Sequence, residues 1–167
     1  MPLASALAAL AAATAQPEPT APAPAAAPSQ FVFEERVVIG AGDDVGATPL
    51  GERIRIPILS GTIAGPQLNG TVLPGSADWQ LRRADGSVQV DADYMIETDD
   101  HVRIHVRNVG VLDQPKGAPQ LYRWTAPQFE APMGRYGWLN DAVFVSQINV
   151  STEQGQTIVR VTVYRIG

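Results

Sequence analysis

The chain contains no cysteine among its 167 residues. This excludes disulfide bonds, a thiolate zinc site, an iron–sulfur cluster and a cysteine nucleophile. Histidine is also scarce, since His101 and His105 are the only two in the sequence. On an extended strand they would lie about 13 Å apart, too far to share a metal ion. We therefore expect neither a metal nor another cofactor.

Positive charge is scarce too. Lys and Arg number 12 against 17 Asp and Glu, which gives a formal net charge of −5. A nucleic-acid-binding protein needs a basic face to displace counterions from phosphates, so this function class is excluded. No window carries a convincing helical stripe, and hence no helix is expected that could follow a phosphate-binding glycine loop. Hydrophobic residues nevertheless make up 45% of the chain, enough for one packed domain.

The first 15 residues have the composition of an export signal. Leu3–Ala15 is small and apolar, and Ala13–Ala15 matches the A-x-A pattern of a cleavage site. The stretch is too short to span a bilayer, so no transmembrane segment is expected. We expect residues 1–15 to form a signal peptide, which would make the protein periplasmic or secreted. Because no Lys or Arg occurs before Arg36, the alternative is an Ala-rich tail on a cytoplasmic protein.

Residues 16–30 alternate Pro with Ala. Each Pro fixes φ and removes a backbone donor, which favours an extended linker over helix or strand. The leader is therefore predicted to be disordered, with one folded domain over residues 31–167.

Within that domain, apolar and polar residues alternate with a period of two, which is typical of half-buried strands. The pattern is clear in Arg53–Ile58, Ser87–Asp93 and His101–Arg107. Thr157–Ile166 carries β-branched residues on both faces and is predicted to be a central strand. Asp85-Gly86 stands between two such segments and suits a tight hairpin turn.

These segments amount to roughly eight to ten strands. The fold class is therefore all-β, and an antiparallel meander of this size hides its edges by closing into a single β-barrel. A barrel of about eight strands can hold side chains or one small ligand. A two-sheet sandwich is the alternative.

Three stretches carry residues that a plain barrel does not need. The first, Gly61–Gln80, contains Asp78 beside Trp79. An indole next to a carboxyl group can desolvate it and raise its proton affinity, which suits an acid–base role. Alternatively, Asp78 caps a turn and Trp79 begins a strand that points into the core.

The second stretch, Leu121–Glu130, contains Arg123, which could neutralise a carboxylate or enolate, or could stack on a neighbouring aromatic ring. The third, Gly134–Asp141, contains Trp138 and Asn140. They would supply a flat wall and an orienting hydrogen-bond group, or would tie down the turn before the next strand.

Two motifs, GTVLPGSADWQ at residues 70–80 and YGWLN at residues 136–140, resemble the domain-of-unknown-function 3237 family of bacterial and fungal proteins. The resemblance covers about residues 31–166. It implies a compact antiparallel β-barrel with a poorly defined activity. Asp93 departs from the family, which usually has a basic residue before the tyrosine. The residues that match the family are Asp78, Trp79, Tyr94, Arg123, Trp138 and Asn140.

Together these observations predict a small-molecule site at one mouth of the barrel. A base, a hydrogen-bond donor and an oxyanion-holding pair suit isomerisation, elimination or cyclisation of a carbonyl compound without a cofactor. In this hypothesis Asp78 is the base, Tyr94 is the donor or acid, and Arg123 and Asn140 hold the oxyanion. The ligand-binding residues are Trp79, Trp138 and Phe129.

Two other functions remain open from the sequence. A non-catalytic protein would use the same aromatic residues to bind an apolar or aromatic ligand. A protein-interaction module would have an exposed apolar patch and no pocket of a few hundred Å³.

Overall fold

The computed structural model describes residues 26–113 and 121–167. The predicted signal peptide over 1–15 and residues 16–25 of the predicted linker lie outside the described residues. The described chain forms strands and one short 3-10 turn, η1. In chain order these elements are β1 (Ser29–Ile39), β2 (Asp43–Thr48), β3 (Gly51–Ala64), β4 (Gly70–Val72), β5 (Ala77–Arg82), β6 (Val88–Thr98), β7 (Arg103–Leu112), β8 (Trp124–Glu130), η1 (Gly137–Leu139), β9 (Val143–Glu153) and β10 (Gln156–Ile166).

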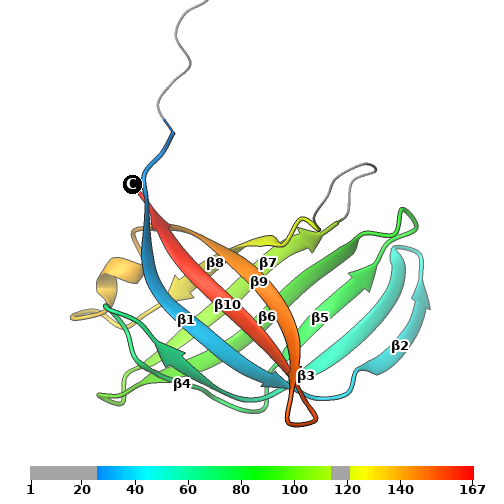
Figure 1. Cartoon of the computed structure of the whole chain (residues 1–167), viewed down its shortest axis with the longest axis horizontal. Coiled ribbons are helices and arrows are strands. Elements are labelled where there is room, and N and C mark those ends of the chain that lie inside the picture. The colour runs from blue at the N-terminus through cyan, green and yellow to red at the C-terminus, as the bar shows by residue number, and fades with distance from the viewer. Residues whose placement is uncertain (1–25, 114–120) are drawn as a thin grey trace, which may run out of the picture.

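The strands close into an antiparallel barrel (Figure 1). Neighbouring strands follow the order β1-β10-β9-β8-β7-β6-β4-β3, and pairing of β1 with β3 closes the ring. Strands β4 and β5 both lie between β3 and β6, so together they occupy one position and the barrel has eight. The predicted all-β barrel is thereby confirmed, and the sandwich is excluded.

Strand β2 extends the sheet beyond the closed ring. Strands β1 and β2 pair with successive parts of β3. Ile39 at the end of β1 lies opposite Ile58 of β3, and Asp43 at the start of β2 lies opposite Arg55 of β3. Strand β10 accompanies β1 only as far as Ile39, and β2 has no strand partner other than β3 among the described residues. The β2–β3 hairpin therefore spreads away from the β9–β10 hairpin (Figure 1).

Segments predicted from alternation are strands in the structure. Arg53–Ile58 lies in β3, and Thr157–Ile166 forms most of β10, which pairs with both β1 and β9 as a central strand. Gly86 has a φ of 89°, the left-handed conformation that a tight hairpin turn requires of glycine. Strand β1 begins at Ser29, two residues before the predicted start of the folded domain.

The opposite end of the barrel is filled. Phe129 lies edge-to-face against Phe144, with ring centroids 4.9 Å apart, and Trp138 packs on the same Phe144 ring at 5.9 Å. Leu139 of η1 is completely buried beneath this cluster. Aromatic side chains are large, so this cluster fills its half of the interior. The other half of the interior is hollow.

The structure also bears on membrane insertion by helices. In the two described ranges, no helix has the length and apolar character needed to cross a membrane.

Candidate functional site

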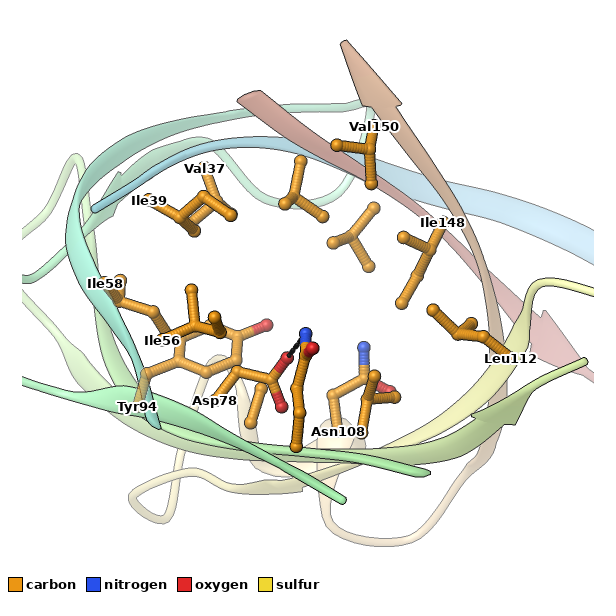
Figure 2. Close-up of a pocket in the computed structure, with 15 residues that line it drawn as sticks. Val37, Ile39, Ile56, Ile58, Asp78, Tyr94, Asn108, Leu112, Ile148 and Val150 are labelled. Atoms are coloured by element: carbon orange, nitrogen blue, oxygen red, sulfur yellow. Dashed lines mark hydrogen bonds between the residues drawn. The ribbon is translucent and has the colours of Figure 1, made fainter. Parts of the chain in front are cut away.

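The hollow half of the barrel encloses a cavity of about 250 Å³ (Figure 2). A cavity of this size contradicts the expectation attached to an interaction module, which predicted no pocket. Of the described residues that line it, most are aliphatic and four are polar. The aliphatic residues are Val37, Ile39, Ile56, Ile58, Val90, Ala92, Leu112, Ile148, Val150, Val159 and Val161; the polar residues are Asp78, Gln80, Tyr94 and Asn108.

The polar side chains occupy one wall, built by β5, β6 and β7. In the register of these strands Asp78 lies opposite Ala92, and Ala92 lies opposite Asn108. Gln80 lies two residues after Asp78 on β5, and Tyr94 lies two residues after Ala92 on β6. Side chains two apart on a strand point to the same face, so both also face the cavity. Figure 2 shows Asp78, Tyr94 and Asn108 on this wall, with Val150 and Ile148 across the cavity.

Asp78 is a mostly buried carboxyl group that still faces the cavity. Its Oδ2 accepts a hydrogen bond from Gln80 Nε2 at 2.7 Å, and its Oδ1 accepts one from the Asp91 backbone N–H at 2.9 Å. Burial raises the pKa of Asp78 above its usual range, and these two hydrogen bonds oppose the rise. A carboxylate of raised pKa is a stronger base, and its desolvation comes from the barrel wall rather than from Trp79, to which the sequence analysis attributed it.

Tyr94 connects the cavity to a second carboxyl group that the sequence analysis missed. Its hydroxyl donates a hydrogen bond to Glu35 Oε2 at 2.6 Å, and Glu35 is fully buried. Burial raises the pKa of Glu35 to about 7, although the bond from Tyr94 opposes this rise. Burial, followed by the nearby Glu35 carboxylate, raises the pKa of Tyr94 well above its ordinary value. The signal was present in the sequence, because Phe33, Glu35 and Val37 alternate and so share a core face of β1.

Asn108 begins a second buried polar group that was also missed. Its Nδ2 donates to Ser146 Oγ at 3.3 Å, and Ser146 Oγ lies 2.6 Å from Thr125 Oγ1. Asn108 Oδ1 has no hydrogen-bond partner although the residue lines the cavity. A buried carbonyl oxygen without a partner carries a desolvation cost, so this amide is an unsatisfied point in the cavity wall.

No cationic side chain lines the cavity among the described residues. Arginines on the strands pair with acids on the outside of the barrel: Arg107 donates two hydrogen bonds to Asp91, and Arg36 pairs with Glu153. In the described ranges, no three His, Asp or Glu side chains gather in a way that could hold a metal ion. The cavity therefore offers acids and acceptors, which suits an uncharged ligand better than an anion.

The structure brings two of the seven predicted site residues, Asp78 and Tyr94, into one cavity. Trp79 follows Asp78 on β5 and points to the outer face, where its side chain is 43% exposed and lines a shallow depression with Arg55 and Arg107. Successive residues of a strand face opposite ways, so Asp78 and Trp79 cannot both point inward. Arg123 stands just before β8, with its Nη1 3.5 Å from Asn149 Oδ1, and does not line the cavity.

The other three predicted residues lie at the filled end of the barrel. Phe129 and Trp138 pack against the core cluster there. Asn140 accepts a hydrogen bond from the Ala131 backbone N–H and donates one to the Ala131 carbonyl, at 2.8 and 3.0 Å. The placement of Trp138 and Asn140 corresponds to the alternative in which they tie down the turn before the next strand.

Comparison with known proteins agrees with this architecture. The sequence profile of the family described as "Protein of unknown function (DUF3237)" matches residues 28–166. The chain belongs to the DUF3237 family. Among curated relatives, UPF0311 protein RPA1785 of Rhodopseudomonas palustris is 34% identical over 129 residues, which cover 70% of this chain and 84% of the relative. UPF0311 protein CA_C3321 of Clostridium acetobutylicum is 34% identical over 124 residues, covering 67% and 75%.

Solved structures have the same fold. The crystal structure of the Rhodopseudomonas palustris protein is 31% identical, with a TM-score of 0.76 over 86% of this chain and all of that one. An enzyme from Penicillium herquei is 21% identical, with a TM-score of 0.69 over 88% of this chain and 99% of that one. A curated relative from the same fungus, "Hydroalkoxylation enzyme phnH", is 33% identical over 84 residues, covering 50% of this chain and 49% of the relative.

Proposed function

We propose that the cavity binds an uncharged small carbonyl compound and catalyses an isomerisation, elimination or cyclisation by acid–base chemistry without a cofactor. The observation that carries the proposal is that Asp78 and Tyr94 lie together on the polar wall of a cavity whose other described lining residues are aliphatic. Titratable groups with raised pKa values in a cavity are candidate acids and bases.

The two residues have complementary roles in this proposal. The Asp78 carboxylate removes a proton from the carbon next to the ligand carbonyl, and its raised pKa makes it a stronger base. The Tyr94 hydroxyl forms a hydrogen bond to the carbonyl oxygen, where negative charge develops. Because Arg123 and Asn140 lie elsewhere, the oxyanion role assigned to them passes to Tyr94.

The similarity to the fungal hydroalkoxylation enzyme supports the cyclase reaction. A hydroalkoxylation adds an alcohol O–H across a carbon–carbon double bond, so one proton leaves oxygen and another reaches carbon. Within a single molecule this addition closes a ring, and it needs only a base, an acid and a shaped cavity.

The experiment is solvent-deuterium exchange into a panel of enolisable cyclic and aromatic ketones, followed by NMR. The wild-type protein should exchange at least one of them, and Asp78→Asn should reduce the rate by about 10²-fold or more. Asp93→Asn is the matched control, because Asp93 lies on the outer face and contacts His105. Equal exchange by wild type and Asp78→Asn would contradict the acid–base role.

A non-catalytic binding function is favoured by a different observation: of the fifteen lining residues in the described part of the chain, eleven are aliphatic. Mass spectrometry of the protein purified from its native host tests this alternative through any ligand that it retains. Recovery of such a ligand unchanged after incubation, together with no exchange of the panel, would support binding over catalysis. Ligand binding should be followed by thermal shift, because Trp79 and Trp138 lie outside the cavity and would report on it poorly.

A further inference from the structure

Glu35 lies on β1 and meets Tyr94 of β6 across the interior, and its side chain is not among those that line the cavity. It is the only acidic or basic residue that is buried in the described part of the chain. Its Oε2 accepts the hydrogen bond from Tyr94, and its Oε1 has no partner. A buried carboxylate is costly when one oxygen is unpaired and no described residue places a cation beside it, so the protonated acid is favoured at this position.

The surroundings of Glu35 isolate it with Tyr94. Its cross-strand neighbours are Ile63 on β3 and Val161 on β10, and neither carries charge. The titratable group that faces Glu35 is Tyr94 on β6, and Asp78 on β5 lies beyond Tyr94. Strands β7, β8 and β9 contribute no ionisable side chain to the described interior. Glu34 and Arg36, beside Glu35 on β1, point outward and pair with residues of the outer face.

The protonation of Glu35 determines what Tyr94 can offer to a ligand. When Glu35 is ionised, the Tyr94 hydrogen points to Oε2, and only the lone pairs of the phenol oxygen remain for the cavity. When Glu35 is protonated, its own hydrogen can bond to the Tyr94 oxygen. The phenol hydrogen is then free to donate to a ligand carbonyl.

We propose that Glu35 is a positioning residue that supplies a proton through Tyr94 to the ligand oxygen. This inference rests on the proposed function. As Asp78 takes the proton from carbon, Tyr94 transfers its hydroxyl proton to the developing enolate oxygen, and Glu35 transfers its proton to Tyr94. The products are the enol, protonated Asp78, neutral Tyr94 and the Glu35 carboxylate. One proton leaves carbon, one reaches the ligand oxygen, and the total charge is unchanged.

The first test needs no ligand. Infrared difference spectra between wild type and Glu35→Gln should contain the carbonyl stretch of a protonated carboxyl group at pH 5.5. This band should fade by pH 8.5 and should shift in Tyr94→Phe, which removes the hydrogen bond. A band that is missing at pH 5.5, or one that Tyr94→Phe leaves in place, would overturn the proposal.

The second test uses the ketone that the wild-type protein exchanges. Glu35→Gln should lower kcat on the order of 10²-fold with little change in KM, because it removes proton delivery rather than the cavity wall. The wild-type rate should fall as the pH rises through about 7, where Glu35 loses its proton, and the variant should lack this decline. Glu34→Gln is the matched control, since Glu34 contacts Arg160 and Thr162 on the outer face.

The two proposals fail in different ways. If Asp78→Asn abolishes exchange and Glu35→Gln matches Glu34→Gln in rate and pH profile, the role of Glu35 is wrong and the proposed function stands. If the wild-type protein exchanges no ketone, the proposed function fails, and a Glu35 band that Tyr94→Phe shifts still supports the coupling of the two residues.

Discussion

Glu35→Gln should make the stability of the protein less dependent on pH. In the folded protein the pKa of Glu35 is about 7, against an ordinary value of 4.5. As the pH rises between these values, the unfolded chain releases the proton first, so the folded state loses stability relative to it. At about 1.4 kcal/mol per pH unit, the loss attributable to Glu35 reaches about 3 kcal/mol above pH 7. The glutamine variant has no proton to release and should not suffer this loss.

The measurement is urea denaturation of both proteins between pH 4.5 and 8. The unfolding free energy of Glu35→Gln relative to wild type should increase by about 3 kcal/mol across this range, whatever the difference is at pH 4.5. Tyr94→Phe provides a second comparison. It removes the hydrogen bond that opposes the rise in the pKa of Glu35, so its decline in stability should extend to higher pH. A difference that stays constant within about 0.5 kcal/mol between pH 4.5 and 8 would refute the reasoning.

Three further predictions concern the cavity, the filled end and the leader. Ala92→Leu places a larger aliphatic side chain between Asp78 and Asn108. Urea denaturation should show a gain in stability of about 1–2 kcal/mol, and thermal shift should show that no cavity ligand binds. Asn140→Ala should destabilise the protein by about 1–2 kcal/mol by removing two hydrogen bonds to Ala131, with an unchanged rate of ketone exchange per folded molecule. Expression of the full chain in an exporting host should yield a mature protein that begins at Gln16, and mass spectrometry finding Met1 retained in the cytoplasm would contradict the predicted signal peptide.

Alternation of residue types made the strands predictable. Arg53–Ile58 and Thr157–Ile166 could be read as strands because a strand with a core face repeats every two residues. The same rule already separates Asp78 from Trp79 and brings Glu35 onto the face of Phe33 and Val37. These two features of the site were therefore within reach of the sequence.

Other features depend on how the strands are staggered. Asn108 and Ser146 come from β7 and β9, which are joined in space only through β8, and their hydrogen bond depends on the register of both pairings. Phe129 reaches the filled end from β8, and Trp138 and Asn140 lie there because the segment after β8 folds back over it. Local patterns contain no information about which end of a barrel a loop covers.

The sequence by itself determined an acidic all-β domain with a carboxyl group and a tyrosine capable of acid–base chemistry, because strand periodicity and side-chain chemistry are local properties. Tertiary structure decided that one half of the barrel is packed with aromatic residues and the other half is hollow. It also decided that Glu35 meets Tyr94 across the interior, because strand closure and register bring together residues that no local pattern connects.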